Sequence, residues 1–262
     1  MKIVFCVMGQ VRSFNKNNEN GNGFAFLVNE LRKLGHEVKT YAVKWDTCPQ
    51  PIYDFDDILV LSDKEYEEKV THIKVTKVSI PVSHIEEYAK QQATEKEIDV
   101  KKRVFSQTYM FFNGAERINA INDDYDILIK WRFDGFVNQS YVKYILGKNF
   151  SELLSASDRL RICVGHIESV ITNMAKNGDY DICVGNIKMD RNGYIFDDKT
   201  LIFSKKYIDT LSSAYDDPVT LCNEVSKMSK YIPNPHSLWT NMITLFGYVC
   251  KGDLSNCISG SR

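Results

Sequence analysis

Between residues 125 and 136 the chain reads Tyr125-Asp-Ile-Leu-Ile-Lys-Trp-Arg-Phe-Asp-Gly-Phe136, an apolar run that ends abruptly in an arginine, an aspartate and a glycine. The β-branched and bulky residues from Ile127 to Trp131 predict a buried strand of an open α/β sheet. Ligands of such sheets bind outside the carboxyl ends of the strands, which is where Arg132 and Asp134 fall. We therefore expect the functional site at this edge of the sheet.

The spacing of Arg132 and Asp134 allows two interpretations. Residues two apart project on the same side of an extended chain, so this pair could hold a phosphate and a divalent metal, an arrangement that suits a nucleotide-sugar diphosphate. The other interpretation is an ion pair that only caps the end of the strand. The spacing alone does not separate them.

Length and composition predict one α/β domain, with a mostly parallel central sheet flanked by helices. A chain of 262 residues with 44% apolar content can bury a full core. Within it we expect a nucleotide-binding half over about residues 1–136 and an acceptor half over about residues 137–262. The 33 basic and 34 acidic residues leave a net charge of -1, which excludes a global basic field for nucleic acid but not a local basic groove.

Cysteine usage and the distribution of apolar residues predict a cytoplasmic protein. The seven cysteines are scattered, often within apolar runs, and no CxxC pair or Cys/His cluster has the spacing of a zinc site. The first apolar run stops at Met8, so we expect no signal peptide. No segment approaches the roughly 18 consecutive apolar residues that a membrane span needs.

Three further strands are predicted before the central one, at Lys2–Met8, Val38–Trp45 and Asp56–Ser62. Polar residues follow them at the expected ligand edge. Gly9 would let the backbone approach a ligand, Arg12 could reach a phosphate, and Asp46 follows the second strand, although a glycine after a first strand is also a common simple turn. The chain lacks the GxGxxG fingerprint there, which argues against an NAD enzyme.

The connections between these strands have their own predicted structure. The asparagine-rich stretch from Ser13 to Gly23 predicts a mobile surface loop that could act as a lid. A helix is predicted over Phe24–Leu34, closed by Gly35, and a second over Val104–Asn122. Their apolar faces are Phe24, Leu27, Val28, Leu31 and Leu34 in the first, and Val104, Thr108, Phe111, Ala115 and Ile118 in the second. Gln107 and Tyr109 either approach the site or serve packing, and Lys101, Lys102 and Arg103 could begin a local basic groove. The charged region between these two helices predicts a strand at His72–Ile80 and a helix opened by the capping box Ser83–Glu86.

After Phe136 we expect strands at Leu160–Gly165 and Tyr180–Gly185 and a hydrogen-bonding stretch at Tyr194–Ser204. In the last stretch Asp197 and Asp198 lie between apolar pairs, where they are either catalytic carboxylates or acids of an exposed turn. The remainder predicts helices at Lys205–Tyr215, Val219–Met228 and Ser237–Phe246, then a loosely held polar tail after Gly252. His236 could cap the last helix or reach a metal.

Four stretches resemble a family of small bacterial and phage glycosyltransferases of the GT-A type, related to lipopolysaccharide and capsule biosynthesis enzymes. They are Met8 to Arg12, Lys44 to Thr47, Tyr125 to Gly135, and Asp197 to Ser204. The resemblance implies a GT-A-like, Rossmann-related fold, and a Mn²⁺ or Mg²⁺ ion held by Asp134 against the donor diphosphate. Arg132 stands where that family's Asp-x-Asp motif has its first acid, and an arginine could itself neutralise the phosphate.

The sequence thus predicts a glycosyltransferase that moves a sugar from a nucleotide-diphosphate sugar to an acceptor hydroxyl. Gly9, Arg12, Asp46, Arg132 and Asp134 would bind the donor, Asp134 and His236 the metal, and Asp197 or Asp198 would take the acceptor proton. We expect a saccharide acceptor. The alternatives are a phage enzyme acting on a hydroxymethylated or already glycosylated cytosine in DNA, and a non-enzymatic sugar- or nucleotide-binding module.

Overall fold

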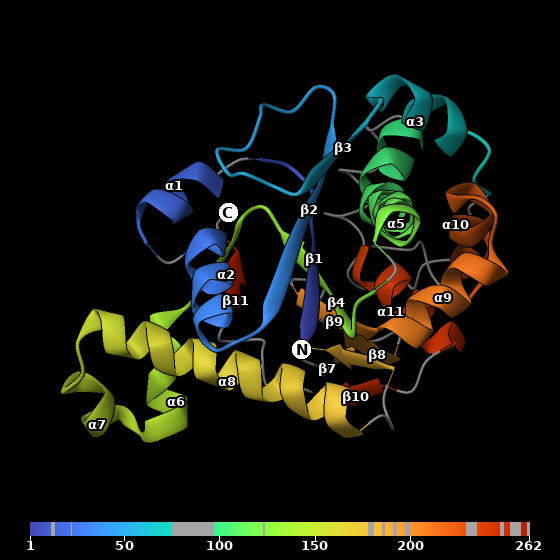
Figure 1. Cartoon of the computed structure of the whole chain (residues 1–262). Helices are drawn as coiled ribbons and strands as arrows, with labels where there is room; N and C mark the ends of the chain where they lie inside the picture. The colour runs from blue at the N-terminus through green and yellow to red at the C-terminus, as the bar shows by residue number, and fades with distance from the viewer. Residues whose placement is uncertain are drawn as a thin grey trace, which may run out of the picture.

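A mixed sheet of seven strands forms the centre of the protein in the computed structural model (Figure 1). The structure describes residues 1–11, 14–21, 23–74, 97–122, 124–177, 181–184, 187–190, 193–196, 200–228, 235–246, 249–251 and 258–260. The strand order is β10-β6-β9-β4-β1-β2-β3. Their bounds are β1 Lys2–Met8, β2 Glu37–Trp45, β3 Asp57–Leu61, β4 Ile127–Arg132, β6 Ile182–Val184, β9 Thr200–Ser204 and β10 Val249–Lys251.

Most of the strand pairs are parallel, as predicted. β1 pairs in parallel with β2 and β4, β2 with β3, and β6 with β10, whereas β9 runs antiparallel between β4 and β6. The predicted strands β1 to β4 are confirmed, and β1 and β4 are the nearly continuous apolar runs expected of strands covered on both faces. Their side chains alternate between two cores, with Leu128 in one and Ile127 and Ile129 in the other.

One core lies between the sheet and a layer of helices led by α5 (Glu97–Ile121). The predicted buried face of this helix is confirmed: Val104, Phe111 and Ile118 are buried. At Gly114 the helix comes so close to the sheet that an added Cβ would lie 2.7 Å from Val43 and 2.9 Å from Cys6. The same layer holds α3 (Asp63–Val70), α9 (Lys205–Ala214), α10 (Pro218–Lys227) and α11 (Pro235–Phe246), the last three close to the predicted helices (Figure 1).

The opposite face is covered by α1 (Phe14–Glu19), α2 (Phe24–Lys33) and α8 (Ala156–Asn177) (Figure 1). The predicted apolar face of α2 is confirmed except for Leu34, which is exposed beyond the helix end, where Gly35 adopts a positive φ of 87°.

The prediction of a mobile loop from Ser13 to Gly23 is wrong for the described part of this stretch. Residues 14–19 form α1 instead, and Phe14 is buried among Phe24, Phe55 and Phe133 with ring centroids 5.2–6.1 Å apart. The asparagines misled the prediction because they serve the backbone: Asn18 Oδ1 accepts a hydrogen bond from the amide of Ala25.

The prediction of a strand at Leu160–Gly165 is also wrong, since this run lies inside α8. The buried residues Cys163, Val164, Ile167 and Ile171 recur at helical spacing, and a short apolar window taken alone hides that period.

The remaining described elements lie mostly at the periphery. They are β5 (Gly135–Val137), the 3-10 turn Gln139–Tyr141, α6 (Val142–Leu146), α7 (Lys148–Glu152), β7 (Ile187–Asp190), β8 (Gly193–Phe196) and β11 (Ile258–Gly260). β11 pairs antiparallel with β5, which corrects the prediction of a loosely held tail for these residues. The predicted strand residues after 74 and the capping box at 83–86 lie outside the described residues. None of the described helices is long and apolar enough to cross a membrane.

Candidate functional site

The strand order creates a crevice at one edge of the sheet. The chain passes from β1 to β2 on one side of β1, whereas β4 pairs on the other side, so the topology switches between β1 and β4. Open α/β sheets bind ligands at such a point, outside the carboxyl ends of the strands. A cleft of about 630 Å³ lies there, within the size range of small-molecule sites. Its lining is Met8, Gly9, Gln10, Trp45, Thr47, Cys48, Asp63, Tyr66, Asp99, Lys102, Arg103, Ser106, Gln107, Met110, Arg132 and Asp134.

Gly9 forms the end of β1 inside this cleft. Its φ of +111° lies in a region that residues with a side chain rarely adopt, and an added Cβ would meet no atom within 4 Å. The glycine therefore gives the turn its conformation and leaves open space against its backbone. The structure thus places Gly9 beside the strand end that carries Arg132, since Met8 and Arg132 are register partners.

Arg132 and Asp134 form a two-pronged ion pair across the β4 turn. The Nε of Arg132 donates to Oδ1 of Asp134, and Nη2 donates to Oδ2, both at 2.8 Å. The carboxylate side chain is 11% exposed and the arginine side chain 34% exposed. Such a planar fork fixes the guanidinium in one orientation, with part of it open to the cleft.

Backbone contacts hold this turn in place. The amide of Phe133 donates to the Met8 carbonyl at 3.2 Å, and Asn17 Nδ2 donates to the carbonyl of Asp134 at 3.4 Å. Behind the turn, a Cβ on Gly135 would lie 2.8 Å from the ring of Trp131, so only glycine fits there. Contacts with β1, with α1 and with Trp131 therefore hold in place the turn that carries the Arg132–Asp134 pair.

The opposite wall of the cleft is one stripe of α5. Asp99, Lys102, Arg103, Ser106, Gln107 and Met110 recur every three or four residues and so share one face of the helix. Gln107 also reaches below the cleft floor, where its Oε1 accepts a hydrogen bond from the buried Nζ of Lys130 at 3.1 Å. That ammonium lies 4.8 Å from the ring centre of Trp239, and Lys130 is the residue two before Arg132 on β4.

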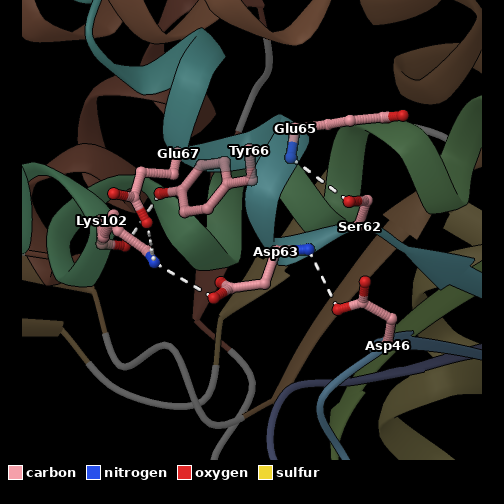
Figure 2. Close-up of polar contacts among 7 residues, drawn as sticks. All are labelled: Asp46, Ser62, Asp63, Glu65, Tyr66, Glu67 and Lys102. Atoms are coloured by element: carbon pink, nitrogen blue, oxygen red, sulfur yellow. Dashed lines mark hydrogen bonds and ion pairs between the residues drawn. The ribbon is translucent and has the colours of Figure 1, made fainter.

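At the rim of the cleft, Lys102 joins α5 to α3 through two carboxylates. Its Nζ lies 3.1 Å from Asp63 and 3.0 Å from Glu67, and Figure 2 shows the ammonium between them. Burial lowers the pKa of Lys102, but the hydrogen bonds to Glu67 and Asp63 outweigh burial and leave the pKa above its ordinary value. Tyr66 adds a hydrogen bond from its hydroxyl to the Lys102 carbonyl at 2.8 Å.

Asp46, which the sequence predicts as a donor ligand, follows β2 at this same edge but is exposed and absent from the cleft lining. Its Oδ1 accepts a hydrogen bond from the amide of Asp63 at 3.1 Å, next to the N-cap Ser62 of α3 (Figure 2). In this structure the carboxylate of Asp46 thus supports the start of a helix, a role for which its sequence position gave no signal.

Of the predicted site residues, the structure brings Gly9, Arg132 and Asp134 together in the cleft. Arg12, Asp197 and Asp198 lie outside the described residues, and His236 is described only as a backbone position in α11. Thr200, the first described residue after the two acids, pairs with Trp131 next to Arg132.

The predicted metal site does not fit the described residues well. Asp134 gives both carboxylate oxygens to Arg132, and Asp63 is bound to Lys102. No group of three or more His, Cys, Asp and Glu side chains within the described ranges is arranged to hold a metal ion.

The cleft wall on α5 was predicted only in part, through Gln107, Lys102 and Arg103, and the buried Lys130 below the cleft was not predicted. A usable signal for the whole wall was the helical spacing of the polar residues from Asp99 to Gln107, which places them on one face of the helix. Lys130 was visible too, as a charge inside a strand that is otherwise apolar.

Comparisons with known proteins find only distant likenesses. No family model and no curated protein matches the chain. Among solved structures, the galactosyltransferase LgtC in complex with donor and acceptor sugar analogues is 12% identical over 96% of this chain and 73% of its own, with a TM-score of 0.40. Mouse xyloside xylosyltransferase 1 is 9% identical (93% and 81%, TM-score 0.39). The inositol-1-phosphate CTP transferase from T. maritima is 10% identical (97% and 85%, TM-score 0.38). Likenesses this remote carry no conclusion about the reaction of this chain.

Proposed function

We propose that this protein is a glycosyltransferase that uses a nucleotide-diphosphate sugar. The observation that carries the proposal is the Arg132 fork, fixed on the end of β4 and open to a cleft at the switch point of the sheet. A guanidinium matches the geometry of phosphate oxygens, and the cleft has room for a nucleotide and a sugar. The four sequence stretches that resemble GT-A glycosyltransferases support the same reading.

In this reaction the bond between the anomeric carbon and the diphosphate oxygen breaks, and the acceptor oxygen forms the new bond to that carbon. Negative charge grows on the departing nucleoside diphosphate, so a fixed cation beside it lowers the barrier. Arg132 would supply that cation, while Lys102 and Arg103 line the far wall of the same cleft. Gly9 would allow the phosphates to lie against the backbone at the end of β1.

The acceptor hydroxyl must lose its proton as the new bond forms, and for an inverting reaction we assign this to Asp197 or Asp198. What supports the assignment is the register of β9, which begins beside the β4 turn that carries Arg132. The donor residue set would also include Arg12, which follows β1 in sequence.

We propose a saccharide acceptor rather than a modified base in DNA. Among the described residues that line the cleft, three acids (Asp63, Asp99, Asp134) face three bases (Lys102, Arg103, Arg132), so this surface has no net positive charge. A DNA acceptor would bring many phosphates, which demand an excess of lysine and arginine.

The test begins with a thermal-shift screen of UDP, GDP, ADP, CDP and dTDP, since a ligand of the folded state raises the melting temperature. The matching labelled nucleotide sugars are then offered with a bacterial glycan extract or with DNA containing hydroxymethylcytosine, at low and high salt. We expect label in the glycan, and loss of label in Asp197→Asn or Asp198→Asn. Label in the DNA that disappears with salt would make the modified base the acceptor. Binding of a nucleotide with no transfer of sugar to either acceptor would indicate a non-enzymatic binding module.

A further inference from the structure

We infer that Arg132, positioned by Asp134, takes the role of the divalent cation, so that the donor diphosphate binds without a metal. The inference rests on the proposed function and specifies how its site handles charge. It follows from the side chains that meet at the β4 turn, and it departs from the Mn²⁺ or Mg²⁺ site that the family resemblance implies.

The first observation is the state of the Asp134 carboxylate. Each of its oxygens accepts a hydrogen bond of 2.8 Å from the guanidinium of Arg132, and the side chain is 11% exposed. A metal bound to these oxygens would lie beside a guanidinium that cannot lose its charge, and two cations in a half-buried site repel. Asp134 is therefore suited to orient an arginine rather than to bind a metal.

The second observation is that other carboxylates of the cleft do not complete a metal site in the described structure. Asp63 is bound to Lys102 at 3.1 Å across the rim. Mg²⁺ and Mn²⁺ need several oxygen ligands in a near-octahedral arrangement. Within the part of the chain that the structure describes, no cluster of three acidic, histidine or cysteine side chains offers this.

The third observation is a second cationic side chain, Lys130, two residues before Arg132 on β4. Lys130 projects from the same face of β4, is fully buried, and donates to Gln107 at 3.1 Å. Gln107 itself lines the cleft. A diphosphate at the fork would therefore meet positive charge at the surface and below it, in a region of low dielectric where such charge acts strongly. Asp134 and Gln107 are positioning residues in this arrangement.

The experiment measures binding by calorimetry with two kinds of probe, the tightest nucleoside diphosphate from the thermal-shift screen and inorganic pyrophosphate, each in EDTA and in Mn²⁺. For the natural sequence we expect dissociation constants that agree within about two-fold in the two conditions, because no metal takes part. Arg132→Asp creates an Asp-x-Asp spacing that could bind a metal. We therefore expect the affinity of this variant for both probes to be very weak in EDTA and at least about ten-fold higher in Mn²⁺.

A matched control is Arg161→Asp, the same charge reversal at a 61% exposed arginine of α8, which should bind like the natural sequence. Because Arg132→Asp sets two acids side by side, a second variant, Arg132→Gln with Asp134→Asn, removes the pair without leaving a buried charge. It should weaken binding about ten-fold or more equally in EDTA and Mn²⁺. Melting curves confirm that each variant is folded.

The outcomes separate this inference from the proposed function. Binding of both probes only in Mn²⁺ would overturn the inference and leave the glycosyltransferase proposal standing. Metal-free pyrophosphate binding that depends on Arg132, with no nucleoside diphosphate binding better, would uphold the inference and remove the proposed donor. No binding of either probe in either condition would overturn both.

Discussion

The two edges of the central sheet each carry a cavity, and the larger one is the weaker candidate site. At the amino ends of β1 and β4 a cavity of about 780 Å³ is lined by His36, Glu168, Asp181 and Lys206 among others. At the carboxyl ends the cleft measures about 630 Å³. Figure 1 marks the N-terminus at the lower end of β1, which is the amino edge of the sheet. Cavity volume alone would thus favour the amino edge, whereas the proposed site lies at the carboxyl edge.

The difference lies in what the polar groups of each edge do. At the amino edge the polar side chains accept hydrogen bonds from backbone amides at the ends of strands and helices. Asp126 accepts from the amide of Lys2 at 2.7 Å, and Ser204 caps α9 by accepting from the amide of Tyr207 at 3.2 Å. Its charged side chains pair with one another, as Lys206 does with Asp181 at 3.4 Å. At the carboxyl edge the Arg132 fork is held by its own strand and remains partly open. The proposal of a site at the carboxyl edge therefore rests on the fixed orientation of a cation and not on the volume of the cavity.

The largest difference between the two edges should appear in kcat/KM when the ion pair of each edge is removed in a separate variant. Arg132→Gln with Asp134→Asn should lower kcat/KM for sugar transfer by about 10²-fold or more, because a fixed cation at the leaving group is lost. Lys206→Gln with Asp181→Asn, the matched change at the amino edge, should leave kcat/KM within about two-fold. If both double variants lost kcat/KM to the same extent, the proposed difference between the two edges would be wrong.

A second comparison uses one glycine at each edge. Gly9 and Gly35 both have positive φ, of +111° and +87°, and a Cβ added to either would meet no atom within 4 Å. Alanine at either position should lower the free energy of unfolding by about 1–2 kcal/mol, because a side chain strains the backbone at positive φ in both places. Only Gly9→Ala should also weaken nucleotide binding, by roughly ten-fold, since its methyl would enter the cleft. Calorimetry and chemical denaturation measure the two effects separately, and weaker binding in Gly35→Ala would contradict the assignment.

A smaller effect is expected at the rim lysine. Lys102→Gln breaks the bridge to Asp63 and Glu67, and Lys205→Gln at the amino edge breaks a bridge to Asp209 of 2.7 Å. Partly exposed bridges of this kind contribute at most about 1 kcal/mol, so both variants should melt close to the natural protein. Donor affinity should fall by up to about five-fold only in Lys102→Gln, and less so at high salt. Unchanged affinity would remove Lys102 from the donor site.

The smallest expected effect is protection of a thiol by bound nucleotide. Cys48 lines the cleft and is partly exposed, whereas Cys6 is buried and burial raises its pKa to about 12, which keeps it unreactive. Iodoacetamide should therefore label Cys48 faster than Cys6 in the folded protein, and a bound nucleoside diphosphate should slow the Cys48 reaction. Peptide mass spectrometry follows each cysteine separately. Labelling of Cys48 that is unaffected by saturating nucleotide would place the ligand elsewhere.

The arrangement of β1, β2 and β4 is predictable because these strands are mostly apolar and are followed by polar residues. The pattern alone places Met8, Trp45 and Arg132 at one edge, and it predicts the face of α5 through Phe111 equally clearly. The run around Cys163 is not predictable from the same rule, because a short apolar run fits both a strand and one face of a helix. The burial of Phe14 is missed because its aromatic partners come from distant segments.

The sequence by itself determined which edge of the sheet carries Gly9, Arg132 and Asp134, since local pattern sets where each strand ends. It left open whether the side chains of Arg132 and Asp134 pair with each other. Only the tertiary structure decided that, because the register of β1 against β4 and the packing of Gly135 on Trp131 fix the turn in which both Asp134 oxygens meet the guanidinium. The same is true of Asp46. Its hydrogen bond with the amide of Asp63 depends on the pairing of β2 with β3, which brings the start of α3 next to the end of β2.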